Sequence, residues 1–283
     1  MYSFAFSRKL LATFARVSLI VATAPLCGQQ NDLNLAGIAH TAIRVSDLEK
    51  SRSFYEQLGF QEAFSRKRDG VPTEAFFKVN DRQFIELYPK TSPAQPVGFM
   101  HVCFESKALH TLRDGYVANG LMPIQVVRAG AGNLLFTMQG PEKQNIEFTQ
   151  YMPGSMHTND RGKHLSNDRV AQQIVAVGIP MQDANAARTF YQQKMAFLPA
   201  KAPAAALRAD HEWLALPGSP GEAIAFVQSL PAHAFELDFG VENPKRTQKQ
   251  LGAKGLHSSK MGAVVFVLDP DGNRIEFLKQ PAQ

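Results

Sequence analysis

Two halves of this chain repeat one another, and the repeat limits the folds that the chain can adopt. The segment HTAIRVSDLEKSRSFYEQLGF, residues 40–60, resembles AVGIPMQDANAARTFYQQKMAF, residues 176–197. Asp47 matches Asp183, which lies 136 positions later in the sequence. A repeat at this spacing indicates a duplicated structural unit, so the fold of one half should predict the fold of the other.

Within each half, the pattern predicts a strand, a helix and then further strands. Residues 38–45 are apolar or alternate as in a strand, and Asp47 can cap the helix that follows. Gly59 is placed to end that helix. Hydrophobic periodicity predicts a second helix at roughly 108–119 and further strands at 75–79, 83–88, 99–104, 133–138 and 145–151. The chain therefore contains four such units, two in each half.

The length of the chain suits two domains. Its 283 residues are 45% hydrophobic, enough to build a sizeable core in each half. We predict a first domain at 35–151, a polar linker at 152–169 and a second domain at 170–280, with the turn sequence DPDG between two strands of the last unit.

The first 28 residues have the composition of a signal peptide. Their first part carries three basic residues and no acid, and residues 17–26 then form an apolar run that is too short to span a membrane. We therefore expect a periplasmic or secreted protein without a stable membrane span. A lipoprotein anchored at Cys27 is an alternative, although Leu26 is a poor residue before such a site. After cleavage, Cys103 is the one cysteine left, so no internal disulfide is expected.

The charge of the mature chain excludes some partners. The formal net charge of +5 falls to +2 once the three basic residues of the leader are removed. This bias is too small to predict binding to nucleic acid or to an anionic membrane.

Four residues in strand-like segments have the types and the order of a metal site. His40 and Glu86 are 46 positions apart, and so are His101 and Glu147. Any one of them is more simply explained as a core or surface residue, but together they offer two imidazoles and two carboxylates at matched positions. These donors suit a divalent ion such as Zn, Ni, Fe, Mn or Co and leave coordination positions open for a substrate.

The motifs resemble those of a known superfamily. The opening HTAIRVSDLEKSRSFYEQLGF, the closing DPDGNRIEF, and IELYP and NIEF between them are similar to the vicinal oxygen chelate superfamily. That superfamily includes glyoxalase I, methylmalonyl-CoA epimerase, fosfomycin- and bleomycin-resistance proteins and extradiol dioxygenases. The resemblance covers residues 35–280 and implies an α+β fold in which four βαβββ modules form two half-barrel domains. In glyoxalase I the metal ligands lie on the first and last strands of each module, the positions that the four residues match.

The second half has lost the imidazoles. The repeat places Ala176 at the position of His40, Ala225 or Phe226 at that of Glu86, and Glu236 and Glu276 at the two remaining positions. Two acids without an imidazole make a poor metal site, so we predict a degenerate second domain. One complete site then requires the two modules of the first domain to pair with each other.

Side chains two or four positions from a ligand share its strand face, which nominates residues for substrate binding. These are Arg44, Tyr88, Lys90 and Cys103. Arg44 matches an arginine that glyoxalase I uses for the glutathione carboxylate, whereas Lys90 departs from the asparagine usual in glyoxalase I. Five further histidines show no ligand-like pairing and are predicted to be surface residues: His157, His164, His211, His233 and His257.

The resemblance favours a metal-dependent lyase or isomerase of the glyoxalase or epimerase type. A small substrate with two adjacent oxygens would react through an enediolate that the metal stabilises, and Glu147 or Glu86 would move the proton as the catalytic base. The alternatives are an Fe(II) extradiol dioxygenase, with His40, His101 and Glu147 as its ligands, and a small-molecule binding protein without activity. The sequence does not choose between a monomer and a homodimer.

Overall fold

Two eight-stranded sheets with the same strand order make up the fold. The computed structural model describes residue 1 and residues 33–201, 211–231 and 234–280. The predicted signal peptide, Cys27 and His233 lie outside the described residues. The first sheet has the order β2-β3-β4-β1-β5-β8-β7-β6 and the second β10-β11-β12-β9-β13-β16-β15-β14. Each strand of one sheet thus has a counterpart at the same place in the other.

The strands of the first sheet are β1 (Gly37–Val45), β2 (Gln61–Arg68), β3 (Val71–Lys78), β4 (Phe84–Pro89), β5 (Gly98–Glu105), β6 (Val127–Arg128), β7 (Leu134–Gln139) and β8 (Asn145–Gln150). Those of the second are β9 (Ile174–Pro180), β10 (Leu198–Pro199), β11 (His211–Leu216), β12 (Ser219–Val227), β13 (Glu236–Val241), β14 (Ser259–Met261), β15 (Val264–Leu268) and β16 (Arg274–Lys279).

The pairing of β1 with β5 joins two modules into one sheet. β1 runs parallel to β4, and β5 runs parallel to β8, while β1 and β5 are antiparallel. The second sheet repeats this arrangement with β9, β12, β13 and β16. The expected α+β fold of four βαβββ modules in two half-barrel domains is confirmed, and the modules of the first half pair with each other.

Two of the described helices, α1 (Leu48–Gln57) and α4 (Ala184–Met195), begin after the repeated aspartates of the sequence. The other described helices are α2 (Leu109–Ala118), α3 (Met156–Asn159) and α5 (Pro244–Ala253), with a short 3₁₀ turn at Pro141–Lys143. Asp47 accepts hydrogen bonds from two backbone N–H groups of the first turn of α1, and Asp183 accepts one from the first turn of α4. Gly59 follows α1 with a φ of +89°, the left-handed conformation that glycine adopts at little cost.

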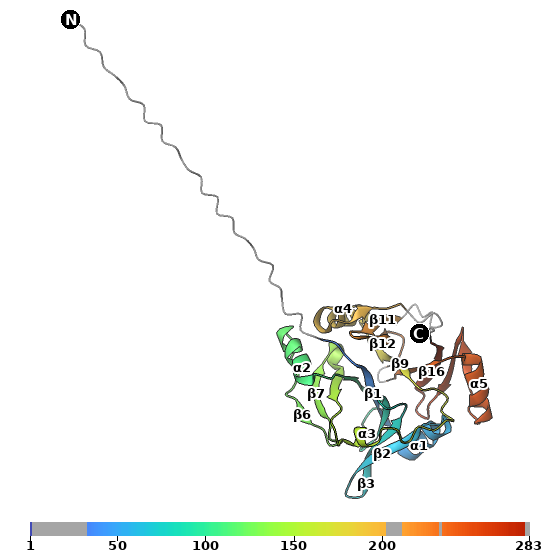
Figure 1. Ribbon diagram of the computed structural model, residues 1–283. Coiled ribbons are helices and arrows are strands. Elements are labelled where there is room, and N and C mark those ends of the chain that lie inside the picture. The colour runs from blue at the N-terminus through green and yellow to red at the C-terminus, as the bar shows by residue number, and fades with distance from the viewer. Residues whose placement is uncertain (2–32, 202–210, 232–233, 281–283) are drawn as a thin grey trace. The chain divides into compact units, whose positions relative to one another are not determined.

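Each helix covers its own sheet, and the two cores are continuous. α1 packs on β2 and β4, and α2 packs on β7 and β8 (Figure 1). The rings of Phe60 and Phe239 stack at 5.2 Å between centroids, and those of Phe104 and Phe197 meet edge to face at 5.5 Å. Such aromatic pairs stabilise beyond their buried area, so the two sheets share one apolar core.

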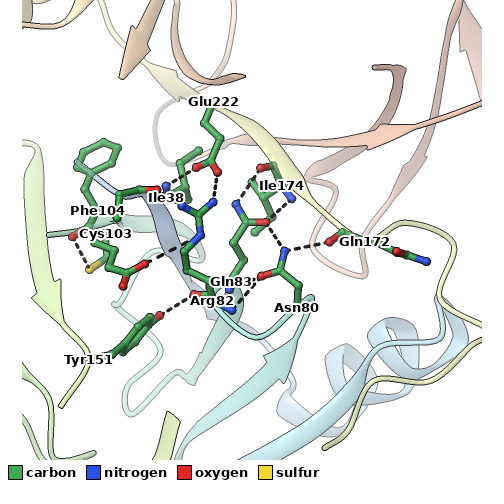
Figure 2. Close-up of polar contacts among 12 residues, drawn as sticks. Ile38, Asn80, Arg82, Gln83, Cys103, Phe104, Tyr151, Gln172, Ile174 and Glu222 are labelled. Atoms are coloured by element: carbon green, nitrogen blue, oxygen red, sulfur yellow. Dashed lines mark hydrogen bonds and ion pairs between the residues drawn. The ribbon is translucent and has the colours of Figure 1, made fainter. Parts of the chain in front are cut away.

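A buried polar junction also links the two sheets (Figure 2). The guanidinium of Arg82, in the turn between β3 and β4, pairs with the carboxylate of Glu222 on β12. Glu222 also accepts the N–H of Ile38. The amide of Gln83 makes two hydrogen bonds, of 2.8 and 2.9 Å, to the backbone of Ile174 at the start of β9. These bonds satisfy backbone groups that would otherwise be buried without partners.

The segment predicted as a polar linker packs closely on the first sheet. It contains α3, which Ser155 caps by accepting the N–H of Thr158. The N–H of Met156 donates to the carbonyl of Ala131, which ties the start of α3 to the loop before β7. The segment therefore contributes side chains to the interior of the first domain.

Four strands were not expected from the sequence. β2 is mostly polar, with Ala63 and Phe64 its two apolar residues, and β6, β10 and β14 are two or three residues long. All four lie at sheet edges or pair on one side, where an apolar pattern is not required. In the part of the chain that the structure describes, no helix is long and apolar enough to cross a membrane.

Candidate metal centre

The concave side of the first sheet brings the four predicted ligands together. His40 lies on β1, Glu86 on β4, His101 on β5 and Glu147 on β8. Ala42, two positions after His40 on β1, is paired with Glu86 on one side and with His101 on the other. Because residues two apart on a strand share a face, the four side chains point to the same side of the sheet. All four are largely buried, with side-chain exposures of 5 to 14%.

Three of the four side chains converge on one point. The Nε2 atoms of His40 and His101 lie 3.1 Å apart. Oε1 of Glu147 lies 3.4 Å from Nε2 of His40, and its Oε2 lies 3.9 Å from Nε2 of His101. Ligands about 2.1 Å from one ion are about 3.0 Å apart at right angles and about 3.4 Å apart at the tetrahedral angle. The observed distances are close to those of donors around a single cation.

The donors also suit a divalent ion chemically. Two carboxylates balance a charge of +2, and neutral imidazoles complete a nitrogen and oxygen set. The Nε2 atoms of His40 and His101 lie 3.1 Å apart and cannot both carry a proton, so at least one lone pair faces the point where the side chains converge. The residues therefore fit a divalent metal ion.

Glu86 approaches the site from the other side of His40. Its Oε1 lies 3.3 Å from Nδ1 of His40, the nitrogen opposite the one that faces His101. Its Oε2 accepts a hydrogen bond of 3.0 Å from the hydroxyl of Tyr88. In this geometry Glu86 orients the His40 ring, and a rotation of its carboxylate would make it a fourth ligand.

Burial and mutual charge separate the protonation states of the four groups. Burial raises the pKa of Glu86 to about 7, against the opposing effect of His40. Burial also opposes ionisation of Glu147, but His101 and His40 outweigh it and lower its pKa to about 2. Burial lowers the pKa of His101 to about 4. For His40, burial favours the neutral ring, yet Glu86 and Glu147 raise its pKa above the ordinary value.

A cavity of about 130 Å³ opens beside these side chains. The lining residues come from both modules of the first domain and from α3, and they include His40, Arg66, Glu74, Phe76, Glu86, Tyr88, Asn133, Leu135, Glu147 and His157. Arg66 on β2 pairs with both carboxylate oxygens of Glu74, at 2.8 and 3.1 Å. A side chain at Gly130 would overlap the Arg66 guanidinium, so the glycine leaves room for that cation at the cavity wall.

The four predicted substrate-binding residues occupy different places. Tyr88 lines the cavity and contacts Glu86. Cys103 is fully buried next to the site, with His40 and Glu147 within reach of its sulfur. Arg44 and Lys90 line a neighbouring surface pocket of about 540 Å³, which shares Tyr88 with the metal cavity. In the structure their side chains contact the carbonyl oxygens of Pro96 and Pro93.

Two histidines that the sequence predicted at the surface are buried. His157 on α3 is 4% exposed and lines the metal cavity, and His211 on β11 is 9% exposed. The prediction was wrong for both because burial of an isolated histidine depends on tertiary packing, which leaves no local pattern. Sequence reasoning also missed Arg66, Glu74 and Asn133, since none of them lies two positions from a ligand.

In the second half-barrel, the side chain of Arg274 lies in the region equivalent to the metal site. Register places Ala225 and Glu236 opposite Gly178, as Glu86 and His101 lie opposite Ala42, which confirms the predicted correspondence. Arg274 lies 3.1 Å from Glu276 and 3.6 Å from Glu236. His211 contributes a contact of 2.9 Å to Glu236. A guanidinium thus balances the retained carboxylates of this half.

Comparison with known proteins agrees with the fold. Residues 37–148 match the family described as the Glyoxalase/Bleomycin resistance protein/Dioxygenase superfamily. No curated protein sequence matches the chain.

Several solved structures share the fold over most of the chain. The 2,3-dioxygenase LapB from Pseudomonas sp. KL28 has 16% identity and a TM-score of 0.63, covering 88% of this chain and 93% of its own. An extradiol ring-cleaving dioxygenase from B. fuscum has 14% identity and a TM-score of 0.65, covering 88% and 73%. The Mn(II)-bound glyoxalase from Novosphingobium aromaticivorans has 15% identity and a TM-score of 0.65, covering 87% and 83%.

At these identities the likeness concerns the fold alone, while the family match rests on the segment that carries His40, Glu86, His101 and Glu147. The part of the chain that carries the four predicted ligands, residues 37–148, is therefore the part that matches the glyoxalase/bleomycin resistance protein/dioxygenase superfamily.

Proposed function

We propose that this chain is an exported, divalent-metal-dependent enzyme that isomerises a small substrate with two adjacent oxygens. The observation that carries the proposal is the convergence of His40, His101 and Glu147, with a fourth carboxylate, Glu86, held beside them. Export rests on the composition of residues 1–28. The tandem duplication is also part of the proposal. Light scattering would decide between a monomer and a homodimer.

His40, His101 and Glu147 would hold the ion on the floor of the cavity. When bound, a divalent ion supplies a Lewis acid that polarises the two oxygens of a substrate and makes the C–H group next to the carbonyl more acidic. Substrate oxygens can bind the ion only if it has open coordination positions, and a set of three protein ligands leaves such positions open.

Glu86 is the side chain best placed to act as the base. It would take a proton from one carbon of the substrate and return it to the neighbouring carbon, while the hydroxyl proton passes to the former carbonyl oxygen; the two transfers together complete an isomerisation without any further reagent. The Tyr88 hydroxyl fixes Oε2 of Glu86 at 3.0 Å and keeps that carboxylate at the cavity wall. Arg66 and Glu74 also line this cavity of about 130 Å³, whose volume limits the size of the substrate.

One observation favours a second candidate, ring cleavage by an extradiol dioxygenase. Because Glu86 faces Nδ1 of His40, the remaining donors form a set of two histidines and one carboxylate, the ligand set of Fe(II) oxygenases. Dioxygenases among the structures of similar fold agree with this candidate. A non-catalytic binding protein is the third candidate.

Metal content and two reactions distinguish the candidates. The purified mature protein, loaded in turn with Mn(II), Ni(II), Zn(II) or Fe(II), would be incubated with dihydroxyacetone in D₂O and, separately, with catechol under air. Deuterium exchange next to the carbonyl supports isomerisation, and oxygen uptake with catechol supports ring cleavage. Glu86→Gln should lower exchange at least about 100-fold with metal content unchanged. Stoichiometric metal with neither reaction favours the binding protein, and absence of metal binding refutes both enzymatic proposals.

A further inference from the structure

A side chain from the segment that joins the two domains lies inside the metal cavity. His157 belongs to α3, yet it lines the same cavity as His40, Glu86 and Glu147 and is 4% exposed. Its Nε2 atom is buried and has no hydrogen-bond partner among the described residues. A buried polar atom without a protein partner beside a cavity indicates that a bound molecule supplies the partner.

The surroundings of His157 fix its ring rather than let it rotate. Four aromatic rings enclose it: Phe64, Phe76 and Phe84 meet it edge to face at 4.8 to 5.5 Å, and Tyr151 stacks on it at 5.0 Å. The backbone before it is held by the bond from Met156 N–H to the carbonyl of Ala131. A ring packed on all sides in this manner is preorganised for one direction of hydrogen bonding.

Asn133 sets which nitrogen carries the proton. Its Nδ2 lies 2.8 Å from Nδ1 of His157. An amide nitrogen only donates, so Nδ1 accepts, and the proton of the neutral ring lies on Nε2. Burial lowers the pKa of His157 to about 3, which agrees with a neutral ring at physiological pH. The free group is therefore an N–H donor.

We infer that His157 binds the substrate of the metal centre by donating a hydrogen bond from Nε2 to one of its oxygens. The inference rests on the proposed function, since it requires a ligand on the metal. It adds a recognition element to that function: one oxygen of the substrate accepts a hydrogen bond from His157. The cavity holds about 130 Å³, so the group that bears the acceptor is compact.

The test uses acetohydroxamate, a compact ligand with two adjacent oxygens, on the full mature protein loaded with Mn(II). Binding is followed by titration calorimetry, metal content by elemental analysis, and folding by thermal unfolding. His157→Phe keeps an aromatic ring in the aromatic surroundings and removes the donor. His157→Gln restores an N–H group. His164→Gln is the matched control, because His164 is on the same segment but contacts Asp160 outside the cavity.

We expect His157→Phe to bind acetohydroxamate about tenfold more weakly, the effect of one lost hydrogen bond, with manganese content unchanged. His157→Gln should recover most of the affinity, and His164→Gln should match the wild type. If His157→Phe does not fold, Asn133→Asp serves instead. Its carboxylate accepts from Nδ1–H and removes the proton from Nε2, so it should weaken acetohydroxamate binding by a similar factor.

The failures of the two proposals are distinguishable. Full manganese content with wild-type acetohydroxamate affinity in His157→Phe overturns the role of His157 and leaves the proposed function intact. A His157→Phe protein that loses manganese but keeps its affinity per bound ion also overturns the inference, because the residue would then serve the metal. A wild-type protein that binds no divalent metal overturns both.

Discussion

The Nε2 atoms of His40 and His101 face each other at 3.1 Å across the antiparallel pair β1 and β5. Their ring planes are inclined by 70°. Only one proton can occupy the space between two such nitrogens, whereas a cation is attracted by both lone pairs. A cation bound at this place should therefore depend on both imidazole rings.

Replacing either histidine should abolish tight metal binding. His40→Ala and His101→Ala remove one nitrogen donor each, and we expect the affinity for Mn(II) or Zn(II) to fall at least about 100-fold, more than the loss of an outer partner costs. Competition with a chromophoric chelator measures the affinity. His257→Ala, at an exposed position, is the control. An unchanged affinity in both variants would exclude this site.

The metal-free protein should show the titration of Glu86 in its stability. The pKa of Glu86 is 4.5 in the unfolded chain, and burial raises it to about 7 in the folded protein. Because the folded pKa is raised, protonation of Glu86 stabilises the fold below pH 4.5, and this contribution is lost as the pH rises through about 7. Glu86→Gln does not titrate, so its stability relative to the wild type should increase between these values.

Urea unfolding with a metal chelator present, at several pH values from 4.5 to 7.5, measures this difference. The comparison with Glu86→Gln is needed because His101, whose pKa is lowered to about 4, contributes with the opposite sign in part of the same range. A difference between the two proteins that does not change with pH contradicts the assigned environment of Glu86.

The hydroxyl of Tyr88 should tune Glu86. Its hydrogen bond favours the ionised carboxylate, so Tyr88→Phe should raise the pKa of Glu86 further. We expect the pH at which half of the sites bind Mn(II), at a fixed metal concentration, to move upward. Tyr116→Phe is a suitable control, since its buried hydroxyl has no hydrogen-bond partner within the described residues. Equal midpoints for all three proteins would count against the contact.

The junction between the two sheets should depend on Arg82 (Figure 2). Arg82→Met leaves the carboxylate of Glu222 buried without its cation and should cost about 3 kcal/mol of stability. Lys50→Met removes one member of an exposed pair with Asp47 and should cost less than about 1 kcal/mol. Urea unfolding compares the two variants. Similar losses would show that the junction contributes no more than a surface pair.

The fold and the convergence of the four predicted ligands could be predicted from the sequence, for reasons that can be given residue by residue. Asp47, Gly59 and Asp183 act through local backbone geometry, which leaves a signature in any sequence. His40, Glu86, His101 and Glu147 occupy repeated positions of a duplicated unit, so their convergence follows once the modules pair.

Other parts of the site could not be predicted in this way. The side of His40 that Glu86 approaches depends on rotamers and on the hydroxyl of Tyr88, which spacing does not record. His157 lies in an aperiodic polar segment, and its burial arises from how that segment wraps over the first sheet. Arg66 and Glu74 reach the cavity from strands that no ligand spacing marks.

Arg274 in the second half-barrel has a consequence for the stability of the chain when metal is scarce. A covalently attached guanidinium cannot be removed by a competing chelator, unlike a coordinated ion. The charge balance of this half therefore does not depend on whether the first half holds a cation, and the two halves share one apolar core. We accordingly expect the chain to keep its fold when metal is removed, so that loading the site requires no refolding step.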